Sequence, residues 1–191
     1  YIIILILSLF SIANFTDYLK ISKKVNLGLD LQGGSYLLLE VDSKPMIKQQ
    51  LQQKYISIKK FLKENKIKYK NIKLINNSIE FLISEEKKDD FEKLILDKEN
   101  SVNLYFNKYR SYEMTHSIEG NKVKLSYSKY GIIEIKNSTL DQSLEIVRRR
   151  IDEVGTNDPT IVRRGSDRIL VELPGLDDPN RIKNLLGKTA N

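Results

Sequence analysis

An uncharged apolar segment opens the chain and restricts what its first part can become. Residues 1–15 are dominated by Ile, Leu and Phe and contain no charged residue. A helix of about 15–18 residues rises roughly 23–27 Å, which approaches the roughly 30 Å hydrocarbon core of a bilayer. The segment therefore predicts a membrane anchor over residues 1–19.

Two alternatives to an anchor stay open from the residues alone. A pattern of small residues ending at Ala13 is compatible with a cleaved signal peptide, and a buried helix of a soluble domain is the third possibility. Lys20, Lys23 and Lys24 follow the apolar segment, and the positive-inside rule would place that flank in the cytoplasm. Because the chain opens with Tyr1 and not Met, we expect an upstream piece.

Composition excludes several classes of site. The chain has no Cys and one His, so disulfides, thiolate nucleophiles and cysteine-based zinc or iron–sulfur sites are excluded. Its net charge is +7, but the lysines are scattered, and no aromatic residue lies in 138–191 to stack on bases near most of the arginines. We therefore expect no nucleic-acid partner.

Hydrophobic periodicity and turn residues divide the first part of the chain into alternating strands and helices. The expected elements are a strand over 36–41, a helix capped by Ser43 that runs to about 65, a hairpin of strands 72–75 and 79–83, a helix after Ser84, and a strand over 102–106. This order predicts a ferredoxin-like βαββαβ unit over residues 20–109.

The second part repeats the order incompletely. Residues 110–137 read as a β-rich connection, which includes a strand over 132–135. The expected elements of residues 138–191 are a helix that begins at Thr139 with a capping box and ends at Gly155, a hairpin of strands 161–163 and 169–173, and a helix that begins at Asp178. The sequence thus predicts an α+β fold of two-layer α/β sandwiches whose second unit is truncated, in a chain that is a fragment at both ends.

A glycine-rich segment is the first candidate motif. It consists of Leu27, Gly28, Leu29, Asp30, Leu31, Gln32, Gly33 and Gly34. A phosphate-binding loop is not favoured, because no Gly-Lys-Ser/Thr sequence is present and no helix opens directly after the glycines. We expect these glycines to permit a sharp bend beside a strand, with Asp30 bracing it.

Charged residues of the second part have structural interpretations. Arg148–150 with Arg163, Arg164 and Arg168 could form a basic patch, but ion pairs with neighbouring carboxylates explain them equally well. The Asp pairs at 89–90 and 177–178 precede helices and favour capping. His116 has no obvious partner.

The glycine-rich segment resembles the signature that follows the first transmembrane helix of the SecD family of protein translocase subunits. The stretch 147–175 is similar to that family's helix, turn and strand, up to its Leu-Pro-Gly sequence. The residues that carry this second similarity are Arg149, Gly155, Pro159, Gly165, Arg168, Leu173, Pro174 and Gly175.

This resemblance implies a non-enzymatic inner-membrane subunit without a cofactor, with an uncleaved anchor and its main domain on the periplasmic side. It would act with SecF and the SecY-SecE-SecG channel complex, using the proton gradient to help export unfolded preproteins. The residues for proton passage would lie outside this chain. From the residues alone, two other classes stay open, namely a ferredoxin-like module that binds RNA or another polyanion and a hydrolase that uses Asp30.

Overall fold

The structure, a computed structural model, describes residues 8, 34–153, 158–176, 178, 183–184 and 186–187. The expected anchor, apart from Ser8, and the signature segment before Gly34 lie outside the described residues. In the described part of the chain, no helix has both the length and the apolar character needed to cross a membrane.

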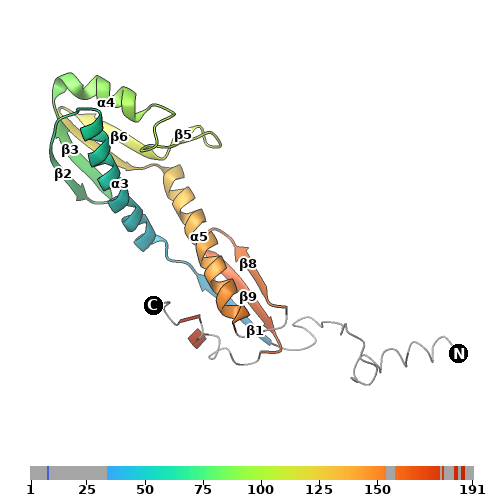
Figure 1. Cartoon of the computed structure of the whole chain (residues 1–191). Coiled ribbons are helices and arrows are strands. Elements are labelled where there is room, and N and C mark those ends of the chain that lie inside the picture. The colour runs from blue at the N-terminus through green and yellow to red at the C-terminus, as the bar shows by residue number, and fades with distance from the viewer. Residues whose placement is uncertain are drawn as a thin grey trace. The chain divides into compact units, whose positions relative to one another are not determined.

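The described residues form a mixed α+β structure with antiparallel sheets (Figure 1). The helices are α3 (Lys44–Glu64), η2 (Glu85–Lys87), α4 (Lys88–Ile95) and α5 (Lys129–Asp152). The strands are β1 (Gly34–Glu40), β2 (Tyr69–Ile75), β3 (Ser78–Ile83), β4 (Tyr105–Phe106), β5 (Ser111–Tyr112), β6 (Met114–Glu119), β7 (Lys122–Tyr127), β8 (Thr160–Arg164) and β9 (Arg168–Pro174). Their sheets have the orders β1-β9-β8, β2-β3-β7-β6 and β4-β5.

The chain divides into two compact units, neither of which is continuous in sequence. One comprises Leu38–Val147 and Val162–Ile169, and the other comprises Tyr1–Leu37, Arg148–Ile161 and Leu170–Asn191. The division passes through β1, α5, β8 and β9, so sequence order alone does not separate the units.

The core of the larger unit lies between α3, α4 and one face of the four-stranded sheet. Alternate residues of β3 face this core, and Phe81 packs edge-on against Phe91 of α4 with ring centroids 5.6 Å apart. Ile58 and Leu62 of α3 are fully buried in the same cluster. Residues three and four apart on a helix share a face, which explains why α3 contributes one apolar stripe.

The hairpin expected after α3 is confirmed. β2 and β3 pair in antiparallel register, and the two turn residues Asn76 and Asn77 have φ angles of 46° and 60°. Two consecutive residues with positive φ are typical of the tight turn that matches strand twist, and asparagine tolerates this backbone better than most residues. The expected helix is also confirmed as α3, although the Ser43 side chain makes no capping hydrogen bond.

The ferredoxin-like arrangement expected for residues 20–109 is not confirmed. β1 pairs with β9 and not with another strand of residues 20–109, while β3 lies between β2 and β7. The expected strand over 102–106 is wrong except for Tyr105–Phe106, which forms a short ladder with β5. Asn103 accounts for part of this difference, because its buried side chain bonds Ile95 O and Met114 N and holds the chain off the sheet.

The expected start of the helix at Thr139 is wrong, because α5 begins ten residues earlier at Lys129. Ser128 caps it: Ser128 Oγ accepts a hydrogen bond from Gly131 N (3.0 Å) and donates one to Tyr112 O (2.7 Å). Thr139 lies inside the helix and donates to Ile135 O. The expected strand over 132–135 is therefore helical, and Ile132 and Ile135 pack on the core at helical spacing.

The three-stranded sheet contains the hairpin that the sequence predicts around Gly165. β1 completes this sheet on the other side of β9. Gly34 lies against Leu173, and Val41 N donates to Asp167 O (2.7 Å), so β1 and β9 run in opposite directions. The helix expected from Asp178 lies mostly outside the described residues.

Candidate functional site: the junction of β1 and β9

The start of β1 approaches the end of β9 so closely that no side chain fits between them. Gly34 has a φ angle of 149°, and a Cβ atom placed on it would lie 2.4 Å from Leu173 O and 3.0 Å from Pro174 Cα. Real Cβ atoms do not approach a carbonyl oxygen this closely. Position 34 therefore requires glycine for two reasons, its backbone conformation and its neighbours.

The Leu-Pro-Gly sequence at the end of β9 forms a tight turn. Leu176 N donates to Leu173 O (3.4 Å), which places Pro174 and Gly175 at the two central positions. Gly175 has a φ angle of 73°. A type II turn favours proline at its first central position and requires a positive φ angle at its second. This explains why Pro174 is followed by a glycine.

A side-chain hydrogen bond closes the junction. Ser35, which is only 3% exposed, donates from Oγ to Leu176 O across 141 positions of sequence. Leu173, the last residue before the turn, is fully buried. The same carbonyl, Leu173 O, thus accepts the turn's hydrogen bond and packs against Gly34.

The junction is held by backbone contacts and one side-chain hydrogen bond. Gly34, Ser35 and residues 173–176 include no titratable side chain, and the Ser35 hydroxyl is engaged with a backbone carbonyl. The arrangement can hold two distant segments together, but it offers no acid, base or charged ligand. In the described part of the chain, no group of His, Asp or Glu side chains has the arrangement of a metal site.

The structure brings some of the predicted motif residues together and places others elsewhere. Gly34, Leu173, Pro174 and Gly175 meet at the junction, whereas the signature residues before Gly34, together with Gly155, lie outside the described residues. The remaining motif residues are Arg149 in the last turns of α5, Pro159 before β8, Gly165 in the β8–β9 turn and Arg168 at the start of β9.

The arginines considered for a basic patch make individual local contacts. Arg163 forms an ion pair with Asp141, and Arg150 donates to Leu186 O. Arg168 Nε lies 3.9 Å from Asp167 Oδ1, at the limit of an ion pair. Arg163 and Arg168 thus lie beside carboxylates, whereas this contact of Arg150 is to a backbone carbonyl.

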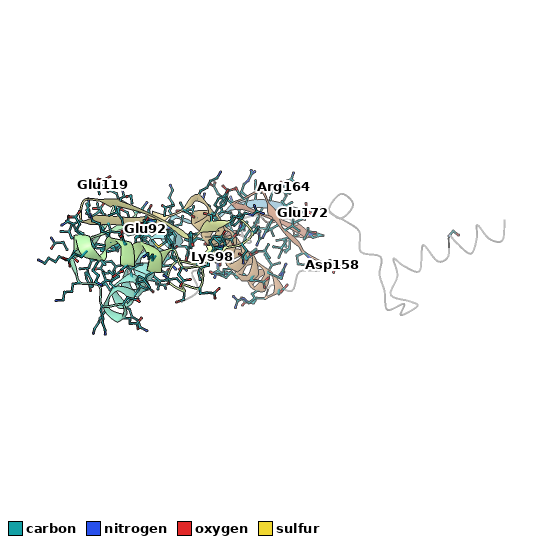
Figure 2. All side chains as sticks on the ribbon, turned by 90° about the horizontal axis from the view of Figure 1, so that it is seen from above. Glu92, Lys98, Glu119, Asp158, Arg164 and Glu172 are labelled. Carbon is teal, nitrogen blue, oxygen red and sulfur yellow. The ribbon has the colours of Figure 1, made fainter. Side chains whose placement is uncertain are left out.

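His116 has a partner that the sequence did not indicate. Its Nε2 lies 3.0 Å from Glu92 Oε1, which joins β6 to α4. Figure 2 shows Glu92 on α4. The contact was missed because the two residues are 24 positions apart, and the helix brings them together only through its packing on the sheet.

Two further ion pairs in the larger unit were also missed. Lys54 of α3 donates from Nζ to Glu113 Oε2 (2.6 Å) and to Val102 O (2.8 Å), and both side chains are largely buried. On the opposite face of the sheet, Lys122 Nζ bonds Glu80 Oε2 (2.8 Å), and this hydrogen bond lowers the pKa of Glu80 despite its partial burial. Both pairs connect neighbouring elements of the larger unit.

Comparisons with known proteins match both sides of the junction. The family model described as the SecD/SecF GG motif matches residues 21–45, which include Gly34 and Ser35. The family model described as protein translocase subunit SecDF, P1 domain, N-terminal, matches residues 140–191, which include the Leu-Pro-Gly turn.

Curated relatives agree over most of the chain. Protein translocase subunit SecD of Rickettsia conorii is 39% identical over 167 residues, which is 87% of this chain and 30% of that protein. The SecD of Acetobacter pasteurianus is 38% identical over 88% of this chain and 32% of its own length, and that of Pseudomonas aeruginosa is 30% identical over 87% and 26%. The chain belongs to the SecD family.

This SecD-family chain spans about 30% of the length of the relatives it matches. No solved structure matches it. The two family models leave residues 46–139 unmatched, so the four-stranded sheet lies outside them. The β1 side of the junction lies within one model and the β9 side within the other.

Proposed function

We propose that the chain is the membrane-proximal part of a non-enzymatic subunit that assists protein export across the bacterial inner membrane. Membership of the SecD family supports this role. In this proposal residues 1–19 are an uncleaved anchor, and the described residues lie on the periplasmic side. The subunit acts with SecF and the SecY-SecE-SecG channel complex on unfolded preproteins, with the proton gradient as the source of energy.

The junction of β1 and β9 carries the mechanical part of the proposal. The segment that follows the anchor enters the fold at Gly34, where it is packed against Leu173 O and tied by Ser35 to Leu176 O. A displacement of the chain at Gly34 would therefore act on a sheet. A rigid entry point is what a subunit that relays movement from the membrane requires.

The test is substitution of the glycines in the full-length protein in cells. We expect Gly34→Val, alone or with Gly33→Val, to slow export of a secreted reporter while the amount of protein in the membrane fraction stays unchanged. The added side chain would push Leu173 O and Pro174 away and loosen the entry point.

A matched control is Gly120→Val in the β6–β7 turn. Gly120 also has a positive φ angle, 56°, but a Cβ atom there meets nothing within 4 Å. Both substitutions carry the backbone cost, and only one disturbs the junction. Normal export by the Gly34→Val protein at a normal membrane level would refute the role of the junction.

A further inference from the structure

A groove of about 950 Å³ lies in the larger unit, at the end of α3. It is lined by the last turn of α3, the connection to β2, the first residues of β2, the end of β3 and the β6–β7 turn. Its volume is within the range of small-molecule sites in proteins, roughly 300–1,000 Å³. Neither the matching family models nor the proposed export role accounts for this groove.

The way in which α3 ends produces an apolar floor. Lys66 adopts a positive φ angle of 55°, and Ile67 N then donates back to Leu62 O (2.9 Å). This helix-terminating turn directs Ile67 into the core and leaves the half-buried Tyr69 and Leu82 at the groove. Aliphatic and aromatic surface therefore forms its base.

The rim of the groove is positively charged. Four exposed lysines line it, at positions 63, 66, 68 and 70, and none of the described lining residues is acidic. Two nearby carboxylates are engaged elsewhere, because Glu64 pairs with Lys60 (3.7 Å) and Glu85 pairs with Lys88 (2.7 Å). An apolar base under an unneutralised cationic rim complements a ligand with an apolar body and an anionic end.

The strand beside the groove is poorly suited to an extended peptide. β2 is an edge strand, but its register shifts between Lys70 and Lys73, and Asn71 has a φ angle of 54°. Such a bulge interrupts the row of backbone groups that an added strand would need. The bulge and the cationic rim favour a ligand without a peptide backbone.

We propose that this groove binds a long-chain fatty acid. The acyl chain lies along Tyr69, Leu82 and the methylene stems of the lysines, and the carboxylate is held between the ammonium groups of Lys66 and Lys68. The site is independent of the export role, so either proposal can fail without the other.

The test is displacement of a fluorescent fatty acid, cis-parinaric acid, from the 191-residue chain by oleate below its micellar concentration. We expect saturable binding that weakens about tenfold or more in Lys66→Glu/Lys68→Glu, because two cations beside the carboxylate become anions. High salt should weaken binding by the parent chain. Oleyl alcohol, which has the same chain and no charge, should compete much less well than oleate.

Lys44→Glu/Lys48→Glu is the matched control, since it makes the same charge change at exposed positions at the other end of α3. We expect its affinity to stay within about twofold of the parent. Circular dichroism checks that both variants fold. Equal affinity of the two variants, equal competition by oleyl alcohol, or tighter binding of an acidic, leucine-rich peptide than of oleate would each overturn the proposal.

Discussion

Two glycines of the described chain lie against carbonyl oxygens that leave no room for a side chain. A Cβ atom on Gly34 would lie 2.4 Å from Leu173 O, and one on Gly131 would lie 2.2 Å from Glu113 O. The motif residues of the sequence included Gly34 and not Gly131. The difference arises because residues 110–137 were expected to be a β-rich connection, and no local pattern indicates that Gly131 approaches Glu113 O.

We predict that Gly131→Ala destabilises the chain although alanine is the better helix former. The gain in helix propensity is about 1 kcal/mol, whereas forcing the first turn of α5 away from Glu113 costs about 1–3 kcal/mol and also strains the Ser128 cap. Thermal unfolding followed by circular dichroism measures the difference. Ser138→Ala, at an exposed position of the same helix, is the control and should raise stability slightly. A rise in the unfolding midpoint for both variants would contradict the close contact.

Substitution of Tyr127, in contrast to that of Gly131, is expected to raise stability. Its hydroxyl is buried and has no hydrogen-bond partner among the described residues, and burial, with a smaller effect of the Glu113 charge, raises its pKa well above the ordinary value. Tyr127→Phe should therefore stabilise the chain by about 1 kcal/mol at neutral pH, because an unsatisfied polar group is removed.

The same residue makes stability depend on pH in the alkaline range. Because the pKa of Tyr127 is higher in the folded chain than in the unfolded chain, this group does not change the free energy of unfolding with pH below about pH 10. Above that pH the unfolded chain releases the proton more readily, so the free energy of unfolding decreases. The advantage of Tyr127→Phe over the parent should therefore grow above pH 10 in urea unfolding. A constant difference would show that the hydroxyl is solvated.

Substitutions of Lys54 and Glu113 test how much a largely buried ion pair contributes to the stability of the chain. We expect Lys54→Ala to cost about 2–3 kcal/mol, because it leaves the Glu113 carboxylate and Val102 O without their donor. Lys54→Met/Glu113→Leu should recover much of this loss, since both charges are then absent. Urea unfolding of the parent, Lys54→Met, Glu113→Leu and the double variant measures the coupling. Simple addition of the two single losses in the double variant would exclude a shared interaction.

Among the helices and strands, local sequence patterns correctly predicted the elements whose structure depends on neighbouring residues. The β2–β3 hairpin follows from Asn76 and Asn77, and the β8–β9 hairpin follows from the turn at Gly165. The first turns of α5 were misread because the Ile residues at 132, 133 and 135 have high strand propensity. The packing of Ile132 and Ile135 on the core at helical spacing, together with the Ser128 cap, overrides that propensity.

The position of the helix cap can be tested directly. Ser128→Ala should cost about 1–2 kcal/mol and reduce helicity, because it removes the acceptor for Gly131 N and the donor to Tyr112 O. Thr139→Ala should change stability by less than about 1 kcal/mol, since a mid-helix hydroxyl bonded to Ile135 O contributes little. Circular dichroism at 222 nm and the thermal midpoint distinguish the two positions. The reverse ranking would place the start of the helix at Thr139.

At the scale of the whole molecule, the pairing of β1 with β9 distinguishes the observed fold from the expected ferredoxin-like one. The chain has no cysteine, so an engineered pair gives an unambiguous result. We predict that Val41→Cys/Asp167→Cys forms a disulfide on mild oxidation, because Val41 N lies 2.7 Å from Asp167 O. Leu38→Cys/Leu82→Cys, which would link β1 to β3, should stay reduced. Peptide mapping by mass spectrometry reads out both pairs, and the opposite result would restore the ferredoxin-like pairing.

Local sequence patterns were sufficient to predict the α+β class, most helices and hairpins, and the two motifs that identify the family. These features depend on residues a few positions apart, whose periodicity, caps and turn conformations act locally. Local patterns did not predict that β1 completes the sheet of β8 and β9, that Gly34 meets the Leu-Pro-Gly turn, or that Lys54 reaches Glu113. Those contacts join segments 59 to 141 positions apart, and they form because apolar faces and backbone groups without a local partner are satisfied only by distant parts of the chain.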